Sequence, residues 1–544
     1  MGRFRGRIKN RKEKETERTG SALPVRLLME ERKTEMKNRK PNILFILSDD
    51  QGAWAMRCAG NTDIHTPNMD RIAAEGYRFE NFFCTSPVCS PARASLLTGR
   101  IPSAHGVQDW ICSGNLDREA LGEIREDPYY RFEDKPIRYL DGMRTYTDVL
   151  KENGYTCALA GKWHLGDSLV PQHGFDRWFT IGRGGCYYYK ADVVENGTIH
   201  FENRYITDVI TDKALGWLAE FQGQEEPFYL SVHYTAPHDP WDEDQHPQEY
   251  VEMYRDCGFT ATPDLPIHPN QIESAPYGTG EVRKSLLRGY YAAITAMDAN
   301  IGRILDRLEE LGMREDTIVI FTADNGMNMG HHGIWGKGNG TFPFNMYDSA
   351  VKVPLLISWP GHYPAGVVCR RMCSQYDFFP TLMDMAGIAD GIPEAYETGS
   401  EEASGKEEER LPGRSFADVF AGNASSGEGK TDSAAKDGSG EWVVVYDEYG
   451  PTRMIRTEEW KYVCRIPYGP DELYHLSVDP EENVNLIDDP EYRPVADRMY
   501  TQMTEWFYRY ADPALDGAKE GVTGFGQLCR PGIYAGRRKV FLEG

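Results

Sequence analysis

Several short apolar stretches of this chain end abruptly in charged or polar residues, and this pattern limits the folds open to it. The stretches are NILFILSDDQG (42–52), TCALAGKWHLG (156–166), PFYLSVHYTAPHDP (227–240), TIVIFTADNG (317–326) and VPLLISWPG (353–361). Unbroken apolar runs of this length are typical of strands that are buried on both faces, as in parallel sheets. Helical patterns lie between them, so we expect an α/β fold with a large, mostly parallel sheet and helices on both faces.

Two segments carry clear helical patterns. TPNMDRIAAEGYRF (66–79) has proline near a helix start and glycine near its stop. Residues 283–312 carry apolar side chains at helical spacing for about eight turns. Met297 and the aromatic residues of this second segment are expected in the core.

The length and composition indicate one large domain and a smaller one. The chain has 544 residues and is 40% apolar, which is enough for a large core. A small antiparallel subdomain is expected near the C-terminus. Its strands would lie in EWVVVYDEYG, TRMIRTEEWKYVCR and DELYHLSVDPEENVNL, and a helix would follow near 491–510. We therefore expect a basic disordered tail (1–39), the α/β catalytic domain (40–391), a low-complexity acidic linker (392–441) and a C-terminal α+β subdomain (442–544).

The charge distribution argues against several partners. The formal net charge is -24, yet residues 1–40 carry 14 Lys and Arg against 6 Glu. The acidic body makes nucleic acid and anionic membranes poor partners, and the basic head lacks the aromatic residues or amphipathic period of a binding arm. No apolar run approaches the roughly 18 residues of a membrane span, and the head has no signal-peptide core. We expect a protein without membrane partners in the cytoplasm.

Two of the strand ends carry acidic residues. Asp49 and Asp50 follow the first apolar run, and Asp324 and Asn325 follow the fourth. Ligands of open α/β sheets gather at the carboxyl ends of the strands, so the polar clusters are expected to meet in one crevice. Adjacent buried carboxylates repel each other unless a cation relieves them, and these oxygen donors suit Ca²⁺ or Mg²⁺. Either cluster alone would more often be an ordinary turn, and it is the presence of both that favours a cation site.

Other strand ends carry cationic and imidazole side chains. Lys162 and His164 are two residues apart, on one face if the strand continues through them. His238 lies between prolines and Lys337 lies in a glycine-rich loop. A lone histidine or lysine on a loop usually faces solvent, but together these residues predict an anion site that can transfer protons.

One cysteine differs from the other ten. Cys89 precedes Ser90 and Pro91, which are typical of a helix start, and Arg93 lies one turn further on. A helix N-terminus and a nearby arginine favour a negatively charged sulfur, so these residues predict a reactive thiolate. The other cysteines show no zinc-site spacing and are expected to be small buried side chains.

The segment CSPARASLLTGR (89–100) resembles the signature of the type I sulfatases, Cys-x-Pro-x-Arg followed by Thr-Gly-Arg. The likeness extends from KPNILFILSDDQG to DELYHLSVDPEENVNL, nearly all of residues 40–490. The family includes the arylsulfatases and belongs to the alkaline phosphatase-like superfamily, whose fold agrees with the α/β pattern. The resemblance implies that a maturation enzyme reads the motif and oxidises Cys89 to formylglycine.

The resemblance also implies the ligands of a cation. The matching residues are expected to bind Ca²⁺, with Mg²⁺ as an alternative, and residue 89 completes the set. These residues are Asp49, Asp50, Cys89, Asp324 and Asn325.

The remaining matches are implied to be catalytic. Arg93 would hold the modified side chain, and Lys162 and His164 would position the aldehyde hydrate and assist collapse of the sulfated intermediate. His238 and Lys337 would bind the sulfate and the leaving-group oxygen, and one of them would be the general acid. The resemblance does not decide which. Lys337 is followed by GNGTFPFNMYDSAVKVP, which departs from the usual Tyr-Glu pair of the family.

The implied reaction is hydrolysis of a sulfate monoester through a covalent formylglycine-sulfate intermediate. Aryl, steroid and carbohydrate sulfates all remain open as substrates. Two alternatives are a phosphonate or phosphate diester hydrolase on the same scaffold and a silent binder of sulfated ligands. Residues 103–140 and 180–205 are aromatic-rich candidates for the pocket rim, whereas His331 and His332 are equally compatible with a structural role.

Overall fold

The computed structural model describes residues 40–273, 275–389, 411–421, 442–447, 452–521 and 524–543. The predicted basic tail and most of the predicted acidic linker lie outside these residues. The domain boundaries therefore stay a prediction. In the described part of the chain, no helix is both long and apolar enough to cross a membrane.

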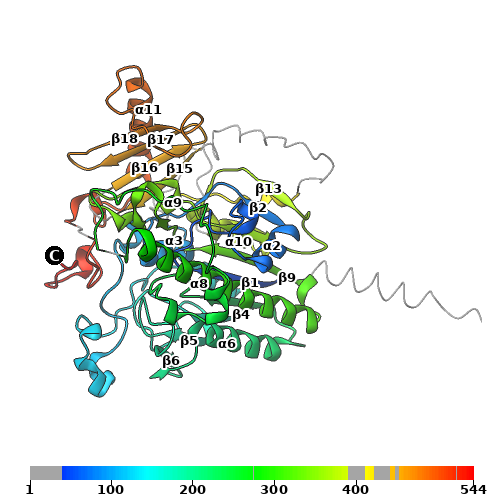
Figure 1. Cartoon of the computed structure of the whole chain (residues 1–544). Coiled ribbons are helices and arrows are strands. Elements are labelled where there is room, and N and C mark those ends of the chain that lie inside the picture. Colours follow the sequence, from blue (N-terminus) through cyan, green and yellow to red (C-terminus); the bar gives the residue numbers. More distant parts are fainter. Residues whose placement is uncertain are drawn as a thin grey trace, which may run out of the picture. The chain divides into compact units, whose positions relative to one another are not determined.

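Five parallel strands form the centre of the large sheet (Figure 1). Their spatial order is β9-β1-β8-β4-β5. The bounds are β1 Asn42–Ser48, β4 Thr156–Gly161, β5 Phe175–Ile181, β8 Phe228–His233 and β9 Thr317–Ala323. The strands are almost entirely buried, as their apolar sequences predict, and their carboxyl ends lie along one edge.

Further strands extend the sheet on both sides, and several of them run antiparallel. They are β2 Tyr77–Phe79, β12 Leu355–Ser358 and β13 Val367–Cys369 on one side, and β6 Ala191–Glu195 and β7 Thr198–Glu202 on the other. The predicted large α/β sheet is confirmed, but it is mixed at its margins. The expectation that the run at 353–361 brings its polar end to the common crevice is wrong, because β12 is antiparallel to β9 and Ser358 lies opposite Val319.

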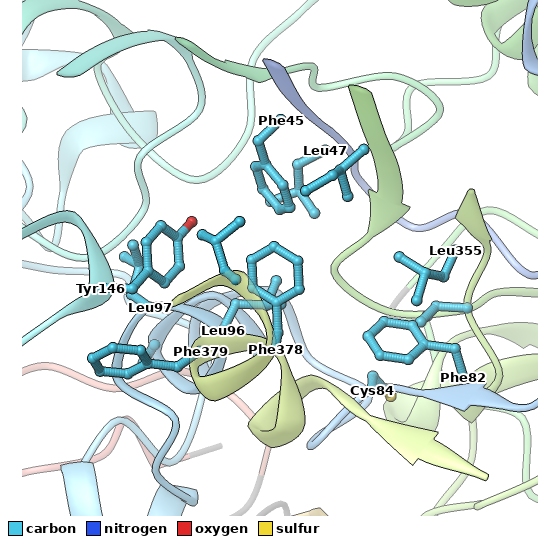
Figure 2. Close-up of a cluster of buried hydrophobic side chains, with 14 of the residues drawn as sticks. Phe45, Leu47, Phe82, Cys84, Leu96, Leu97, Tyr146, Leu355, Phe378 and Phe379 are labelled. Atoms are coloured by element: carbon cyan, nitrogen blue, oxygen red, sulfur yellow. The ribbon is translucent and has the colours of Figure 1, made fainter. Parts of the chain in front are cut away.

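Two apolar cores cover the two faces of this sheet. Alternate residues of β1 serve each core: Phe45 and Leu47 pack on one face, and Leu44 and Ile46 pack on the other. Figure 2 shows Phe45 and Leu47 facing Leu97 and Phe378 across the first core. The helices on this face are α3 Cys89–Thr98, α5 Tyr146–Glu152 and α10 Phe378–Met385. Those on the other face are α2 Pro67–Ala74, α6 Ile206–Phe221 and α8 Gly280–Glu310, and α8 includes the buried Met297.

The C-terminal part contains a separate, fully antiparallel sheet (Figure 1). Its strands are β15 Trp442–Asp447, β16 Thr452–Thr457, β17 Trp460–Arg465 and β18 Glu472–His475. Helix α11, Arg493–Tyr510, shares an apolar core with these strands. The small antiparallel sheet predicted from the sequence is confirmed.

Short elements complete the fold. The helices are α4 Pro102–His105, α7 Gln248–Glu252 and α9 Asp348–Val351. The two-residue strands are β3 Phe82–Phe83, β10 Asn328–Met329, β11 Trp335–Gly336 and β14 Cys373–Ser374.

The first core should depend strongly on Phe378. Its ring is fully buried, with its centroid 5.2 Å from that of Phe45 and 5.7 Å from that of Tyr146. Phe378→Ala should lower the free energy of unfolding by about 3–5 kcal/mol, because a cavity replaces the ring. Chemical denaturation should also include Tyr508→Ala, a control at an aromatic side chain that is 92% exposed and should change stability by less than about 0.5 kcal/mol. Equal losses in the two variants would contradict this packing.

Candidate functional site

The acidic residues predicted as cation ligands lie together at the carboxyl ends of β1 and β9. These strands are neighbours in register, with Ser48 opposite Ala323, so the two residues that follow each strand meet. Asp50 N donates to Asp324 Oδ1 at 3.1 Å, and Asn325 Nδ2 donates to Asp50 Oδ1 at 2.8 Å. All four side chains are buried. Asp50 has φ 62, a left-handed conformation that is uncommon outside glycine and concentrates at functional sites.

Cys89 is the first residue of α3, as its Ser-Pro neighbours predict. Its Sγ lies 3.2 Å from Asp49 Oδ1 and 3.6 Å from Asp50 Oδ1. The expected thiolate is not supported, because burial and the negative charge of Asp49 raise the pKa of the Cys89 thiol well above its ordinary value. The sulfur is therefore held as a neutral thiol beside the carboxylates.

Arg93 lies one helical turn beyond Cys89 and contacts the carboxylate at the end of β9. Arg93 Nε donates to Asp324 Oδ2 at 3.0 Å, and Arg93 Nη1 donates to the carbonyl oxygen of Lys162 at 3.0 Å. Burial raises the pKa of Asp324, but the positive charges of Arg93 and Lys162 together outweigh it, and the pKa lies below its ordinary value. Arg93 thus joins the cysteine helix to two strand ends.

Both predicted lysines contact the acidic cluster. Lys162 Nζ is hydrogen bonded to Asp49 Oδ2, and Lys337 Nζ lies 2.6 Å from Asp50 Oδ1 and 2.9 Å from Cys89 Sγ. Burial opposes the charge of each lysine, but the pKa of Lys162 is raised by Asp49 and that of Lys337 is raised by Asp50. Both side chains therefore remain ammonium ions.

His164 lies beside Lys162, but not in the predicted way. Strand β4 ends at Gly161 and His164 has φ 56, so the two residues do not lie on one face of a continuing strand. His164 Nε2 donates to the carbonyl oxygen of Ile111 at 3.0 Å, and burial followed by the charge of Lys162 lowers its pKa well below the ordinary value. The ring is therefore neutral and carries its lone pair on Nδ1.

His238 lies at the more open side of the cluster. Its side chain is 22% exposed, and its Nε2 lies 3.7 Å from Asp50 Oδ2. His238 Nδ1 donates to the carbonyl oxygen of Asp239 at 2.9 Å. Among the predicted catalytic residues this imidazole is the most accessible to solvent.

The two histidines of the 330–333 turn make local packing contacts. The ring of His331 lies 4.8 Å from that of Trp54, and the ring of His332 stacks on Tyr347 at 3.6 Å. Burial lowers the pKa of each to about 4. Of the two alternatives for His331 and His332, lining the pocket or a structural role, these contacts favour the structural role.

The predicted rim segments reach the site at three points. Ile111 supplies the carbonyl oxygen that binds His164, and Tyr188 Oη donates to the carbonyl oxygen of His238 at 2.8 Å. Gly184 lies directly against His164, since a Cβ atom there would be 2.0 Å from Nε2. Only a residue without a side chain fits between this loop and the imidazole.

The site also uses residues that the sequence did not single out. Tyr290 Oη donates to the carbonyl oxygen of Asp50 at 2.9 Å, and Gln375 Nε2 donates to that of Asp324 at 2.7 Å. His233 Nδ1 donates to the carbonyl oxygen of Lys162 at 3.0 Å. The sequence contains one indication of His233, since it is a polar residue at the end of an apolar strand. Tyr290 and Gln375 lie in ordinary helical sequence, which gives no such indication.

The donor set fits a hard divalent cation. One carboxylate oxygen from each of Asp49, Asp50 and Asp324 and the Sγ atom of Cys89 lie within 4.8 Å of one another. Asn325 Oδ1 is buried and has no hydrogen-bond partner among the described residues. A buried oxygen without a donor is costly, and a cation with oxygen ligands would satisfy it.

The fold and the site together define a hydrolase of the alkaline phosphatase-like class. The sulfatase family model matches residues 41–388. The chain therefore belongs to the type I sulfatase family and is a sulfuric ester hydrolase.

Known relatives cover most of the chain. An N-acetylglucosamine-6-O-sulfatase of Bacteroides thetaiotaomicron is 27% identical, over 88% of each chain. An arylsulfatase of Clostridium perfringens is 27% identical, over 90% of this chain and 98% of the relative. A solved structure of a protein in complex with its substrate D-glucosamine-2-N,6-O-disulfate has a TM-score of 0.68 and 25% identity, and covers 89% of this chain and 100% of that chain.

The tight contact at Gly184 gives a test of the site geometry. Gly184→Ala should lower sulfatase activity at least about tenfold, because the added methyl group displaces His164 from Ile111. Gly216→Ala is the matched control, since a Cβ atom at this position in α6 meets nothing within 4 Å. Steady-state rates and thermal midpoints of both variants should be measured. An unchanged rate for Gly184→Ala would show that the position of His164 has no bearing on activity.

Proposed function

We propose that this sulfatase removes the sulfate group of a sulfated saccharide, with residue 89 as the nucleophile after its conversion to formylglycine. The saccharide substrate is supported by the relatives, which include the N-acetylglucosamine-6-O-sulfatase and the structure with bound glucosamine disulfate. Aryl and steroid sulfates are the substrates to compare with it.

The position of the Cys89 sulfur is the observation that carries the proposal. It lies at the first residue of a helix, where unpaired N–H groups favour negative charge. It also lies between the acidic cluster, 3.2 Å from Asp49 Oδ1, and the ammonium group of Lys337 at 2.9 Å. A nucleophile at this point is beside both the cation ligands and a group that can neutralise sulfate charge.

The proposed site would bind Ca²⁺, with Mg²⁺ as the alternative. Its ligands would be Asp49, Asp50, Asp324, Asn325 and residue 89. The bound cation would supply positive charge that polarises the sulfate oxygens. Without it, the three carboxylates are balanced by Arg93, Lys162 and Lys337. With a divalent cation, the cluster therefore carries an excess of positive charge that attracts a sulfate ester.

The hydrate of formylglycine would supply two hydroxyl groups on one carbon, one to form a sulfate ester with the enzyme and one to release it as the aldehyde re-forms. In this scheme Arg93 holds the side chain of residue 89, and Lys162 fixes the carboxylate beside it. His164 offers the lone pair of Nδ1 as a hydrogen-bond acceptor, because its Nε2–H is donated to Ile111. An unmodified cysteine or a serine would have no internal route for releasing the sulfate.

We assign His238 as the general acid and Lys337 as the group that binds the sulfate. Lys337 Nζ lies 2.6 Å from Asp50 Oδ1 and 2.9 Å from the Sγ atom of residue 89, where an ammonium group can bind a sulfate oxygen. His238 is part-exposed and its Nε2 lies 3.7 Å from Asp50 Oδ2, so in this proposal it meets the leaving oxygen from the solvent side of the cluster. Two points remain predictions: that a maturation enzyme modifies Cys89, and that the protein is located in the cytoplasm.

A phosphonate or phosphate diester hydrolase on the same scaffold is the second candidate. The phosphonate monoester hydrolase of Agrobacterium radiobacter has a TM-score of 0.61 but 21% identity, which supports a common fold only. Relative rates on an aryl sulfate and an aryl phosphodiester distinguish the two activities. A silent binder of sulfated ligands would hydrolyse neither.

The nucleophile is tested by Cys89→Ala, which should lower kcat on the order of 10³-fold or more. The protein should come from its native host, and the peptide FENFFCTSPVCSPAR (79–93) should show a carbonyl in place of the Cys89 thiol by mass spectrometry. Cys84→Ala is the matched control, because Cys84 is a second buried cysteine in the same peptide. Full activity of Cys89→Ala would exclude residue 89 as the nucleophile.

The assignment of the general acid predicts a dependence on the leaving group. His238→Ala should lower kcat/KM about 10²–10⁴-fold on a sugar sulfate, whose alkoxide needs a proton. The loss should be much smaller on para-nitrophenyl sulfate, whose phenolate leaves unprotonated. His200→Ala, at an exposed histidine, is the control. Equal losses on both substrates, or this dependence in Lys337→Met instead, would reject His238 as the acid.

A further inference from the structure

Asn345 holds the backbone of the loop that carries Lys337. Asn345 Nδ2 donates to the carbonyl oxygens of Lys337 at 3.0 Å and Gly338 at 3.1 Å. Asn345 N also donates to the carbonyl oxygen of Gly338, at 3.0 Å. The Asn345 side chain is 3% exposed. These three hydrogen bonds close the loop that presents Lys337 to Cys89 and Asp50.

Cationic side chains of the C-terminal sheet hold both neighbours of Asn345. Arg465 donates to the carbonyl oxygen of Phe344 from Nε at 3.0 Å and from Nη2 at 2.6 Å. Lys461 Nζ donates to the carbonyl oxygen of Met346 at 2.9 Å. Lys461 and Arg465 both belong to β17 and are both buried. The backbone on each side of Asn345 is thus tied to one strand of a different sheet.

Carboxylates fix these two cations in turn. Lys461 pairs with Asp348 at 2.6 Å and with Glu482, and Arg465 pairs with Glu472 at 2.9 Å. Asp348 is the first residue of α9, so the far end of the loop joins the same network. A buried cation cannot leave its partners without exposing an uncompensated charge, which makes this attachment rigid.

The loop itself has little intrinsic order. Its sequence GKGNG places three glycines around Lys337, and glycine loses the most conformational freedom on folding. A lysine that must meet Cys89 Sγ at 2.9 Å therefore needs its backbone held from outside.

We propose that Asn345, held by Lys461 and Arg465 of β17, positions the ammonium group of Lys337 for the reaction. The C-terminal sheet thereby acts on catalysis without contacting the reacting atoms. This inference rests on the proposed function, in which Lys337 binds the sulfate group.

A double-mutant cycle tests the inference. Asn345→Ala should lower kcat/KM for para-nitrophenyl sulfate about 10–100-fold, because displacing a catalytic group by about 1 Å costs this much. In a Lys337→Met background the same substitution should change the residual rate less than about twofold, because there is no ammonium group left to position. Equal factors in the two backgrounds would overturn the inference.

Arg465→Gln is a second variant, and its effect on kcat/KM is measured in both the native and the Lys337→Met background. The test therefore does not depend on the folding of Asn345→Ala. Arg465→Lys should recover part of the lost rate, because it keeps one donor for Phe344. Arg453→Gln is the matched control: Arg453 is buried on neighbouring β16 but pairs with Asp516 at 2.6 Å and should leave kcat/KM unchanged. An Arg453→Gln loss as large as that of Arg465→Gln would also overturn the inference.

The same variants distinguish a failure of the proposed function from a failure of this inference. Full activity of Lys337→Met would remove Lys337 from the reaction and would contradict its role in binding sulfate. A large loss in Lys337→Met with full activity of Asn345→Ala and Arg465→Gln would leave that role intact and reject the positioning by β17 alone.

Discussion

The balance of buried charge at the ends of β1 and β9 is the constraint on which the site depends. Asp49, Asp50 and Asp324 are withdrawn from water, and three carboxylates so close together are unfavourable without compensation. Arg93, Lys162 and Lys337 provide that compensation. Removing any one of these partners would leave an uncompensated buried charge, so the acidic strand ends and the cationic side chains require one another.

This requirement explains why distant segments converge. Arg93 comes from α3, Lys162 follows β4, and Lys337 comes from a loop after β11. The two lysines are held by further hydrogen bonds: His233 donates to the carbonyl oxygen of Lys162, and Asn345 donates to that of Lys337. The cost of ordering these segments is shared between the charged cluster and the hydrogen bonds and ion pairs that support it. The C-terminal sheet enters the site through this support and contributes no reacting group.

Much of the fold was predictable because apolar runs of strand length are informative by themselves. Buried strands such as β1 and β9 have no polar face, and the residues that follow them lie at the same edge when the strands are parallel. The direction of β12 was not predictable, because its apolar run fits either direction. The condition that β4 continues through His164 is not met, because the strand ends at Gly161, which has φ 114, and His164 itself has a left-handed conformation.

The sequence by itself determined the chemistry of this protein. It contains the residues of the sulfatase signature, the strand-end acids, and the lysines and histidines from which the site is built. Only the tertiary structure decided how each of them is held. The neutral state of the Cys89 thiol, the fit of Gly184 against His164 and the hold of β17 on the Lys337 loop all depend on burial and on contacts between remote segments. These are properties of distance and solvent exclusion, which no local pattern of residues encodes.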